Sequence, residues 1–173
     1  MPQLVLPSTK YKASYLRARK EFECVVLETH RAGQDTDVNA KTLDQFLEKV
    51  NNDRKGVNLP KGRVPQTVYW LVEGSRYIGT ISIRHRLNKL LRSWGGHIGY
   101  SVRPSDRRKV YGTLMLKLVL PKAKKLGLTK VLITCDETNI GSAKIIKANG
   151  GVFAGRVPAT TEHAVKCRYW ITP

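Results

Sequence analysis

Short runs of apolar residues, separated by polar turns, predict a group of β-strands in the middle of the chain. The runs over residues 67–72 and 77–83 are separated by Gly74 and Ser75, a spacing typical of an antiparallel hairpin. Similar runs predict further strands over residues 4–6, 99–102 and 129–135.

Apolar side chains at helical spacing predict four helices, over residues 11–27, 43–52, 112–126 and 139–149. In the first helix we expect inward contacts from Tyr15, Leu16, Phe22 and Val26. Thr42 is a suitable N-cap for the second helix, and residues 31–39 are expected to form a polar turn. Pro121 cannot donate to the carbonyl of Lys117, so the third helix should kink or split there.

A basic loop joins the strand at residues 99–102 to the helix that follows. It contains Arg107, Arg108 and Lys109 and opens directly into the helix near Gly112. Unpaired backbone N–H groups and the helix dipole make such a helix start a site for anions, and glycine lets a phosphate approach the backbone closely. Because the chain has neither a P-loop nor a dinucleotide fingerprint, we expect a different pyrophosphate.

Two motifs resemble the GNAT superfamily of N-acetyltransferases. Arg107-x-x-Val110-x-Gly112, after Val102-Arg103-Pro104, is similar to the acyl-CoA loop of that superfamily. Asn139-x-x-Ser142, followed by Gly150, is similar to its second conserved helix. The stretch from Gly95 to Pro104 also resembles a bacterial branch of predicted acetyltransferases.

The resemblance implies an α/β fold with one acyltransferase domain over residues 1–173 and a core over residues 65–155. Its mixed, mostly antiparallel central sheet would have six to seven strands, with a splay between two central parallel strands, flanked by about four helices. Acetyl-CoA would be the cosubstrate, with no metal. The residues expected to bind it are Tyr100, Ser101, Val102, Arg107, Arg108, Lys109, Val110, Tyr111, Gly112, Thr113, Asn139 and Ser142.

The family transfers an acetyl group directly from the thioester to an amine, and the chain departs from its pattern at two places. Val110 replaces a glycine, and a β-branched residue tolerates positive φ badly, so the affinity for CoA should suffer. Ile146 stands where many members have the tyrosine that protonates the thiolate. His97 and Tyr100 are the catalytic candidates, with His97 as base or water-positioning group and a purely structural His97 as the alternative.

The chain carries 31 Lys and Arg against 13 Asp and Glu, a net charge of +18. A field of this sign favours a small neutral or anionic amine as acceptor over a polycation. It also leaves nucleic acid as a possible, less favoured partner. The alternatives are therefore a basic binding module for nucleic acid or a protein or peptide N-acetyltransferase.

The segment over residues 84–96 has two interpretations. Its five basic residues with Trp94 could form a recognition element, or Leu87, Leu90 and Leu91 could anchor a long connection to the core. The three cysteines fit neither a disulfide framework nor zinc-ligand spacing. Without a signal peptide or membrane span, the sequence predicts a cytoplasmic protein, monomeric or a homodimer, with no membrane partner.

Overall fold

The computed structural model describes residues 1–29, 42–161 and 164–173. The polar turn predicted over residues 31–39 therefore lies outside the described residues. The helices are α1 (Lys12–Thr29), α2 (Leu43–Lys55), α3 (Tyr111–Lys125) and α4 (Ile140–Ala148), with short turns η1 (Thr9–Tyr11), η2 (Leu91–Gly95) and η3 (Pro104–Asp106). The strands are β1 (Gln3–Val5), β2 (Gln66–Glu73), β3 (Arg76–Arg84), β4 (Ile98–Val102), β5 (Val131–Asp136), β6 (Val152–Val157) and β7 (Lys166–Ile171).

The described strands form two antiparallel sheets. One has the order β1-β2-β3-β4 and the other the order β5-β7-β6. The predicted hairpin is β2 and β3, in which Trp70 lies opposite Thr80. In the second sheet Cys135 and Cys167 are direct cross-strand partners, a proximity that their positions in the sequence do not reveal. The α/β fold and its strand number are as predicted.

A short joint at His97 connects the two sheets. The backbone N–H of His97 donates to the carbonyl of Leu132 at 2.7 Å, and the N–H of Leu132 donates to Nδ1 of His97 at 2.9 Å. Beyond this joint β4 and β5 pair in separate sheets, so the predicted splay between these strands is confirmed.

Helices cover both faces of the first sheet, and two apolar cores result. Strands β2 and β3 are buried on both sides, which explains their nearly continuous apolar sequences. On one face, α1 and α2 pack an aromatic cluster around Trp70. On the other, α3 packs Met115 and Leu116 against the strands.

Two expected core contacts are wrong, and the split expected as one outcome at Pro121 does not occur. The side chain of Leu16 is 38% exposed, and Leu90 is 59% exposed, so neither anchors the core. Helix α3 continues through Pro121 to Lys125 without splitting. Its buried side chains on both sides of Pro121 pack against the sheet, and this packing outweighs the proline cost of about 3 kcal/mol.

Gly96, next to His97 in the joint, has a backbone conformation and a close contact that only glycine allows. It has φ +63° and ψ −170°, a combination that is essentially restricted to glycine. A Cβ atom here would lie 2.6 Å from the carbonyl oxygen of Leu132 in β5. Both features follow from the tight entry into β4.

We expect Gly96→Ala to lower the free energy of unfolding by about 3 kcal/mol or more, because backbone strain and the collision add. Gly62→Ala is the matched control. Gly62 also has positive φ, +84°, but its Cβ position is open, so the cost should be about 1–2 kcal/mol. Urea denaturation followed by circular dichroism measures both, and equal losses would contradict the role of the joint.

Candidate active site

The loop before α3 has its one positive φ at Arg108, not at Val110. Arg108 has φ +60°, whereas Val110 has φ −69°, in the right-handed helical region, and is the N-cap of α3. The side chain of Val110 is 75% exposed. The expected strain at Val110 is therefore wrong, because the left-handed residue of this loop lies two positions earlier.

The start of α3 presents a run of unpaired backbone N–H groups. The first helical bond is from the N–H of Leu114 to the carbonyl of Val110, at 2.9 Å, and no side chain caps the helix. Within the described part of the chain, the N–H groups of residues 108–113 have no hydrogen-bond acceptor outside the helix. Together with the positive end of the helix dipole, they form a site for an anion.

Glu21 of α1 fixes the first half of this loop. Its carboxylate accepts from Nε of Arg103 at 2.8 Å, also from Nη2 of Arg103, and from the N–H of Ser105 at 3.2 Å. Burial alone would raise the pKa of Glu21, but these hydrogen bonds outweigh it and hold the pKa below its usual value.

Asp106 fixes the second half and is fully buried. It pairs with Arg76 at the start of β3 and with Lys109, whose Nζ lies 2.9 Å away. Arg107 turns back over the ring of Phe22, 5.9 Å from its centroid, and donates to the carbonyl of Val102. Two of the three expected phosphate-binding cations therefore also stabilise the loop itself.

Gly112 lies where α3 contacts α4. A Cβ on Gly112 would come within 2.6 Å of Cδ1 of Ile145, and Asn149, the C-cap of α4, donates to the carbonyl of Thr113 at 3.2 Å. Asn139 caps α4 by accepting from the N–H of Ser142 at 3.0 Å. This packing gives a reason for glycine at residue 112 that is independent of any phosphate.

Tyr100 connects β4 to the start of α4. Its hydroxyl lies 2.7 Å from Oγ of Ser142, and burial raises the pKa of Tyr100 to about 12. Burial also raises the pKa of the nearby Cys135 thiol on β5. Both groups therefore hold their protons at neutral pH, so Tyr100 can donate a proton but is a poor base, and Cys135 is a poor nucleophile.

His97 lies in the joint, away from this pair. Its Nδ1 already accepts the N–H of Leu132, which places the ring proton on Nε2 in the neutral form. Burial, with Arg92 and Arg84 nearby, lowers the pKa of His97 to about 4. This geometry favours the structural alternative for His97 over a general base.

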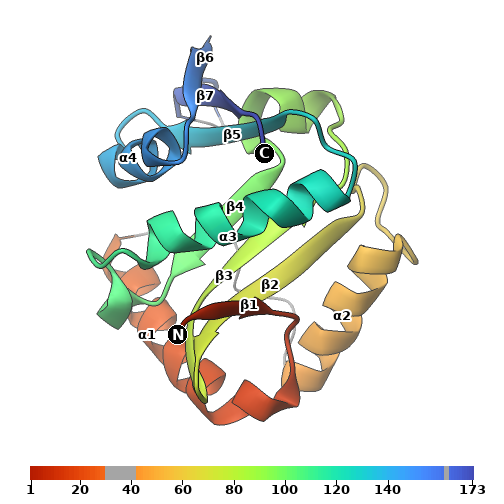
Figure 1. The fold of residues 1–173 in the computed structure, drawn as a ribbon, viewed down its shortest axis with the longest axis vertical. Helices are drawn as coiled ribbons and strands as arrows, with labels where there is room; N and C mark the ends of the chain where they lie inside the picture. The colour runs from red at the N-terminus through yellow and green to blue at the C-terminus, as the bar shows by residue number, and fades with distance from the viewer. Residues whose placement is uncertain (30–41, 162–163) are drawn as a thin grey trace.

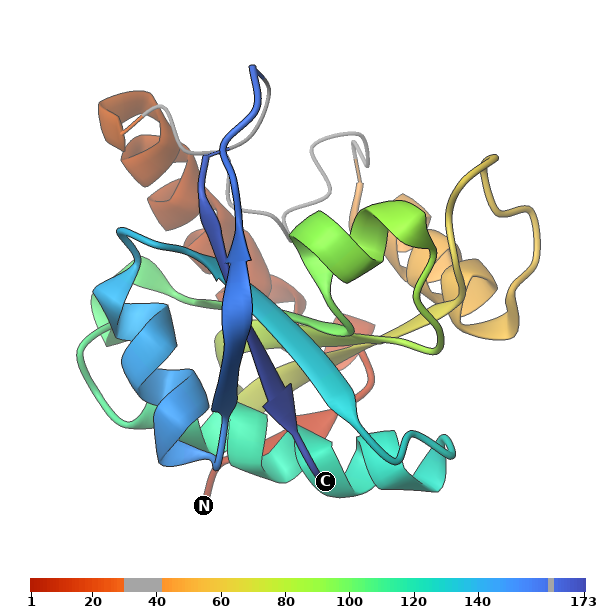
Figure 2. The same cartoon turned by 90° about the horizontal axis from the view of Figure 1, so that it is seen from above.

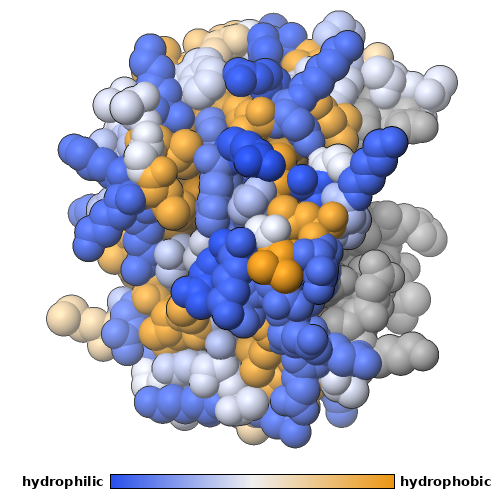
Figure 3. Space-filling model, turned by 90° about the vertical axis from the view of Figure 1, so that its right-hand side faces the viewer, coloured by the Kyte–Doolittle hydropathy of each residue, from blue (hydrophilic) through white to orange (hydrophobic). Residues whose placement is uncertain are grey.

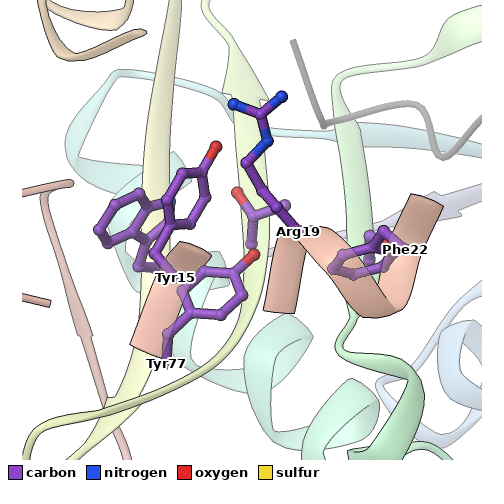
Figure 4. Close-up of a pocket in the computed structure, with 7 residues that line it drawn as sticks. Tyr15, Arg19, Phe22 and Tyr77 are labelled. Atoms are coloured by element: carbon purple, nitrogen blue, oxygen red, sulfur yellow. The ribbon is translucent and has the colours of Figure 1, made fainter. Parts of the chain in front are cut away.

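A small cavity lies on the other face of the sheet, beneath α1. Figure 4 shows Tyr15, Arg19 and Phe22 on α1 and Tyr77 on β3 around it. Its volume is about 10 Å³, enough for one water-sized group. The remaining lining residues are Trp70, Thr80 and Ser101, and the buried indole N–H of Trp70 has no acceptor among the described residues.

Comparison with known families identifies the chain. The family described as an acetyltransferase (GNAT) domain matches residues 19–152, most of the sequence. The protein therefore belongs to the GNAT acetyltransferases, and it is an acetyl-CoA-dependent N-acetyltransferase. No curated protein matches the sequence. Among the described residues, no cluster of three or more His, Cys, Asp or Glu could hold a metal, and no helix is long and apolar enough to cross a membrane.

Solved structures share the fold at low identity. The self-immunity acetyltransferase MccE for microcin C7, in complex with acetyl-CoA and AMP, is 15% identical with a TM-score of 0.70, over 99% of this chain and 92% of that one. YncA of Salmonella typhimurium, with acetyl-CoA, is 14% identical with a TM-score of 0.65, over 99% and 92%. Spermidine N-acetyltransferase of Vibrio cholerae, with CoA and spermine, is 13% identical with a TM-score of 0.65, over 99% and 95%.

The lowered pKa of His97 should make the stability of the fold depend on pH. Its folded pKa of about 4 lies below the ordinary value of 6.5, so the unfolded chain binds more protons between these values. Stability should therefore fall as pH drops from 6.5 to 4, and His97→Gln should remove much of that slope in urea denaturation. His85→Gln is the control, because burial lowers that pKa too but His85 lies outside the joint. A structural role for His97 predicts that His97→Gln keeps the shape of the pH profile of kcat/KM, and a lost ionisation there would restore the base role.

Proposed function

We propose that the enzyme transfers the acetyl group of acetyl-CoA directly to the primary amine of a small neutral or anionic acceptor. The unpaired N–H groups over residues 108–113 are the observation that supports the binding of acetyl-CoA. They are the donors that a pyrophosphate requires, and Arg108, whose side chain forms no hydrogen bond or ion pair with described residues, adds positive charge.

The loop is suited to this task because its shape is fixed before any ligand arrives. Glu21 and Asp106 hold both of its halves. The Val110 side chain is exposed and is not packed into the loop. Since little ordering is left to be done on binding, the replacement of the family glycine by Val110 should cost little affinity.

Tyr100 is our candidate for the proton donor. When bound, acetyl-CoA supplies an activated acyl group and a thiolate leaving group. The Tyr100 hydroxyl spans the space between β4 and α4 and stays protonated, so it can take the place of the tyrosine that Ile146 replaces. Ser142 orients this hydroxyl from the first turn of α4.

The cavity under α1 supports the choice of acceptor. The cation of Arg19 and the buried indole N–H of Trp70 both line it. These groups match an oxygen of a carboxylate, phosphate or hydroxyl and repel a polycation. Ser101 reaches the same cavity from β4, the strand that also carries Tyr100, but the two side chains point to opposite faces of the sheet. The cavity has room for only one terminal oxygen of an acceptor.

We expect Tyr100→Phe to lower kcat about 100-fold, the lower end for lost general acid catalysis, because a thiolate can also leave unprotonated. The KM for acetyl-CoA should change little. Tyr11→Phe, which removes a buried phenol on the opposite face, is the control and should keep wild-type kcat. An unchanged kcat in Tyr100→Phe would exclude this residue as the donor.

Thioester consumption against a panel of amines tests the acceptor. Neutral and anionic amino acids and aminoacyl nucleotides should be better substrates than polyamines and aminoglycosides. Arg19→Gln should raise the KM for anionic acceptors about 10-fold and leave the KM for acetyl-CoA unchanged. Lys20→Gln, the exposed neighbour on α1, is the matched control. Polycations as the best substrates would refute the acceptor class, and absence of acetyl-CoA binding in calorimetry would refute the phosphate site.

A further inference from the structure

A second groove lies at the opposite end of α3 from the phosphate loop. It has a volume of about 490 Å³ and runs between β1, β2 and the last turns of α3. Arg54 and Lys122 stand on its sides and Tyr69 and His85 line it. Because α3 has 15 residues, its two ends are about 22 Å apart, and this groove is not part of the acetyl-CoA site.

Three basic segments meet around this groove. They are residues 54–63, 84–92 and 122–130, and each contains four Lys or Arg and no Asp or Glu. Asn88 donates to the carbonyl of Gly62 at 2.8 Å, which holds the first two segments together, and Lys122 brings the third to the groove. Figure 3 shows hydrophilic side chains spread over this side of the molecule, with apolar patches between them.

Apart from Arg84, which donates to the carbonyls of Gly95 and Gly96, the charge of these segments is little used inside the protein. Arg54 bonds to the neutral Asn51, and no ion pair between an acid and the other cations of the three segments is found among the described residues. Twelve like charges on one end of a small domain repel one another and weaken the folded state. A polyanionic partner would offset that repulsion.

The groove also offers a flat aromatic surface between cations. Nζ of Lys122 lies 4.8 Å from the centroid of the Tyr69 ring. Nε2 of His85 lies 2.8 Å from the hydroxyl of Thr67, which fixes its ring at the same wall. A base that displaces the Lys122 ammonium from the Tyr69 ring can stack there while Lys122 and Arg54 pair with the phosphates on either side. Neither an acidic peptide nor a membrane surface uses both features.

We infer that this basic groove, defined by Arg54, Tyr69, His85 and Lys122, binds a single-stranded polynucleotide. Single strands fit better than a duplex, because a concave site of this size takes an unpaired base, whereas a duplex presents only its backbone and groove edges. The inference does not depend on the acceptor proposed above, since the two sites lie on different parts of the molecule.

Fluorescence anisotropy with a labelled 12-nucleotide single-stranded RNA of mixed sequence, measured across a KCl series, tests the inference. We expect the logarithm of the association constant to fall with log[KCl] at a slope of about −3, as for about four neutralised phosphates. Arg54→Gln with Lys122→Gln should make that slope shallower by about 1.4, as for two lost phosphate contacts, and weaken binding at every salt concentration. Tyr69→Ala should weaken binding about 5- to 100-fold with little change in slope.

The double variant Lys144→Gln with Lys147→Gln is the matched control, because it removes the same charge from exposed positions on α4. It should bind like the wild type. Circular dichroism and an unchanged affinity for acetyl-CoA show that the variants are folded. If the variant with both Arg54→Gln and Lys122→Gln does not fold, Arg54→Gln alone replaces it in the test.

Competing ligands decide the class of partner. Single-stranded DNA that binds like RNA supports the inference, because the contacts proposed are to bases and phosphates. Tighter binding of the matched duplex, of polyglutamate or of vesicles rich in phosphatidylserine would overturn it. Equal weakening by the groove variant and by the α4 control would also overturn it, since that result indicates only the net charge.

Discussion

The hydrogen-bonded joint between His97 and Leu132 is the constraint on which the active site depends. It ties β4 to β5 at one end with two bonds, and the two strands then pair in different sheets. Parallel strands that continued to pair would leave no space between them. Because they separate, the side chain of Tyr100 can reach α4, and a substrate arm can approach the same place. The buried, neutral imidazole is thus part of the architecture that makes room for the chemistry.

The phosphate loop depends on a second constraint, which is the use of acids inside a basic region. Between residues 54 and 135 the chain has only two acids, Glu73 and Asp106. Asp106 is buried under the loop, and Glu21 contacts the loop from α1 through Arg103. These carboxylates neutralise the cations that hold the loop in shape and leave the backbone amides to the ligand. Preorganised donors of this kind lose little entropy on binding.

The sequence predicted the parts of the fold that are determined locally. The hairpin, the N-cap at Thr42 and the start of α3 each depend on a few neighbouring residues. The contacts of the site depend on residues far apart, as in the bond between Glu21 and Arg103, and no local pattern reveals them. Strands β6 and β7 were missed individually, because β6 is short, partly exposed and interrupted by Gly155 with positive φ.

The two ends of α3 differ in how much positive charge the helix dipole calls for. At its N-terminus the helix dipole itself attracts an anion, so few cations are needed there. At its C-terminus Lys122, Lys124 and Lys125 offset the negative end of the dipole, but that end amounts to only about half a charge. The lysines exceed this need several-fold, and in the neighbouring segment at residues 54–63 only Arg54 and Lys55 lie in the last turn of α2, where they offset its dipole. Helix stability therefore accounts for a small part of the positive charge at this end, and the remainder is available for the polynucleotide that we infer.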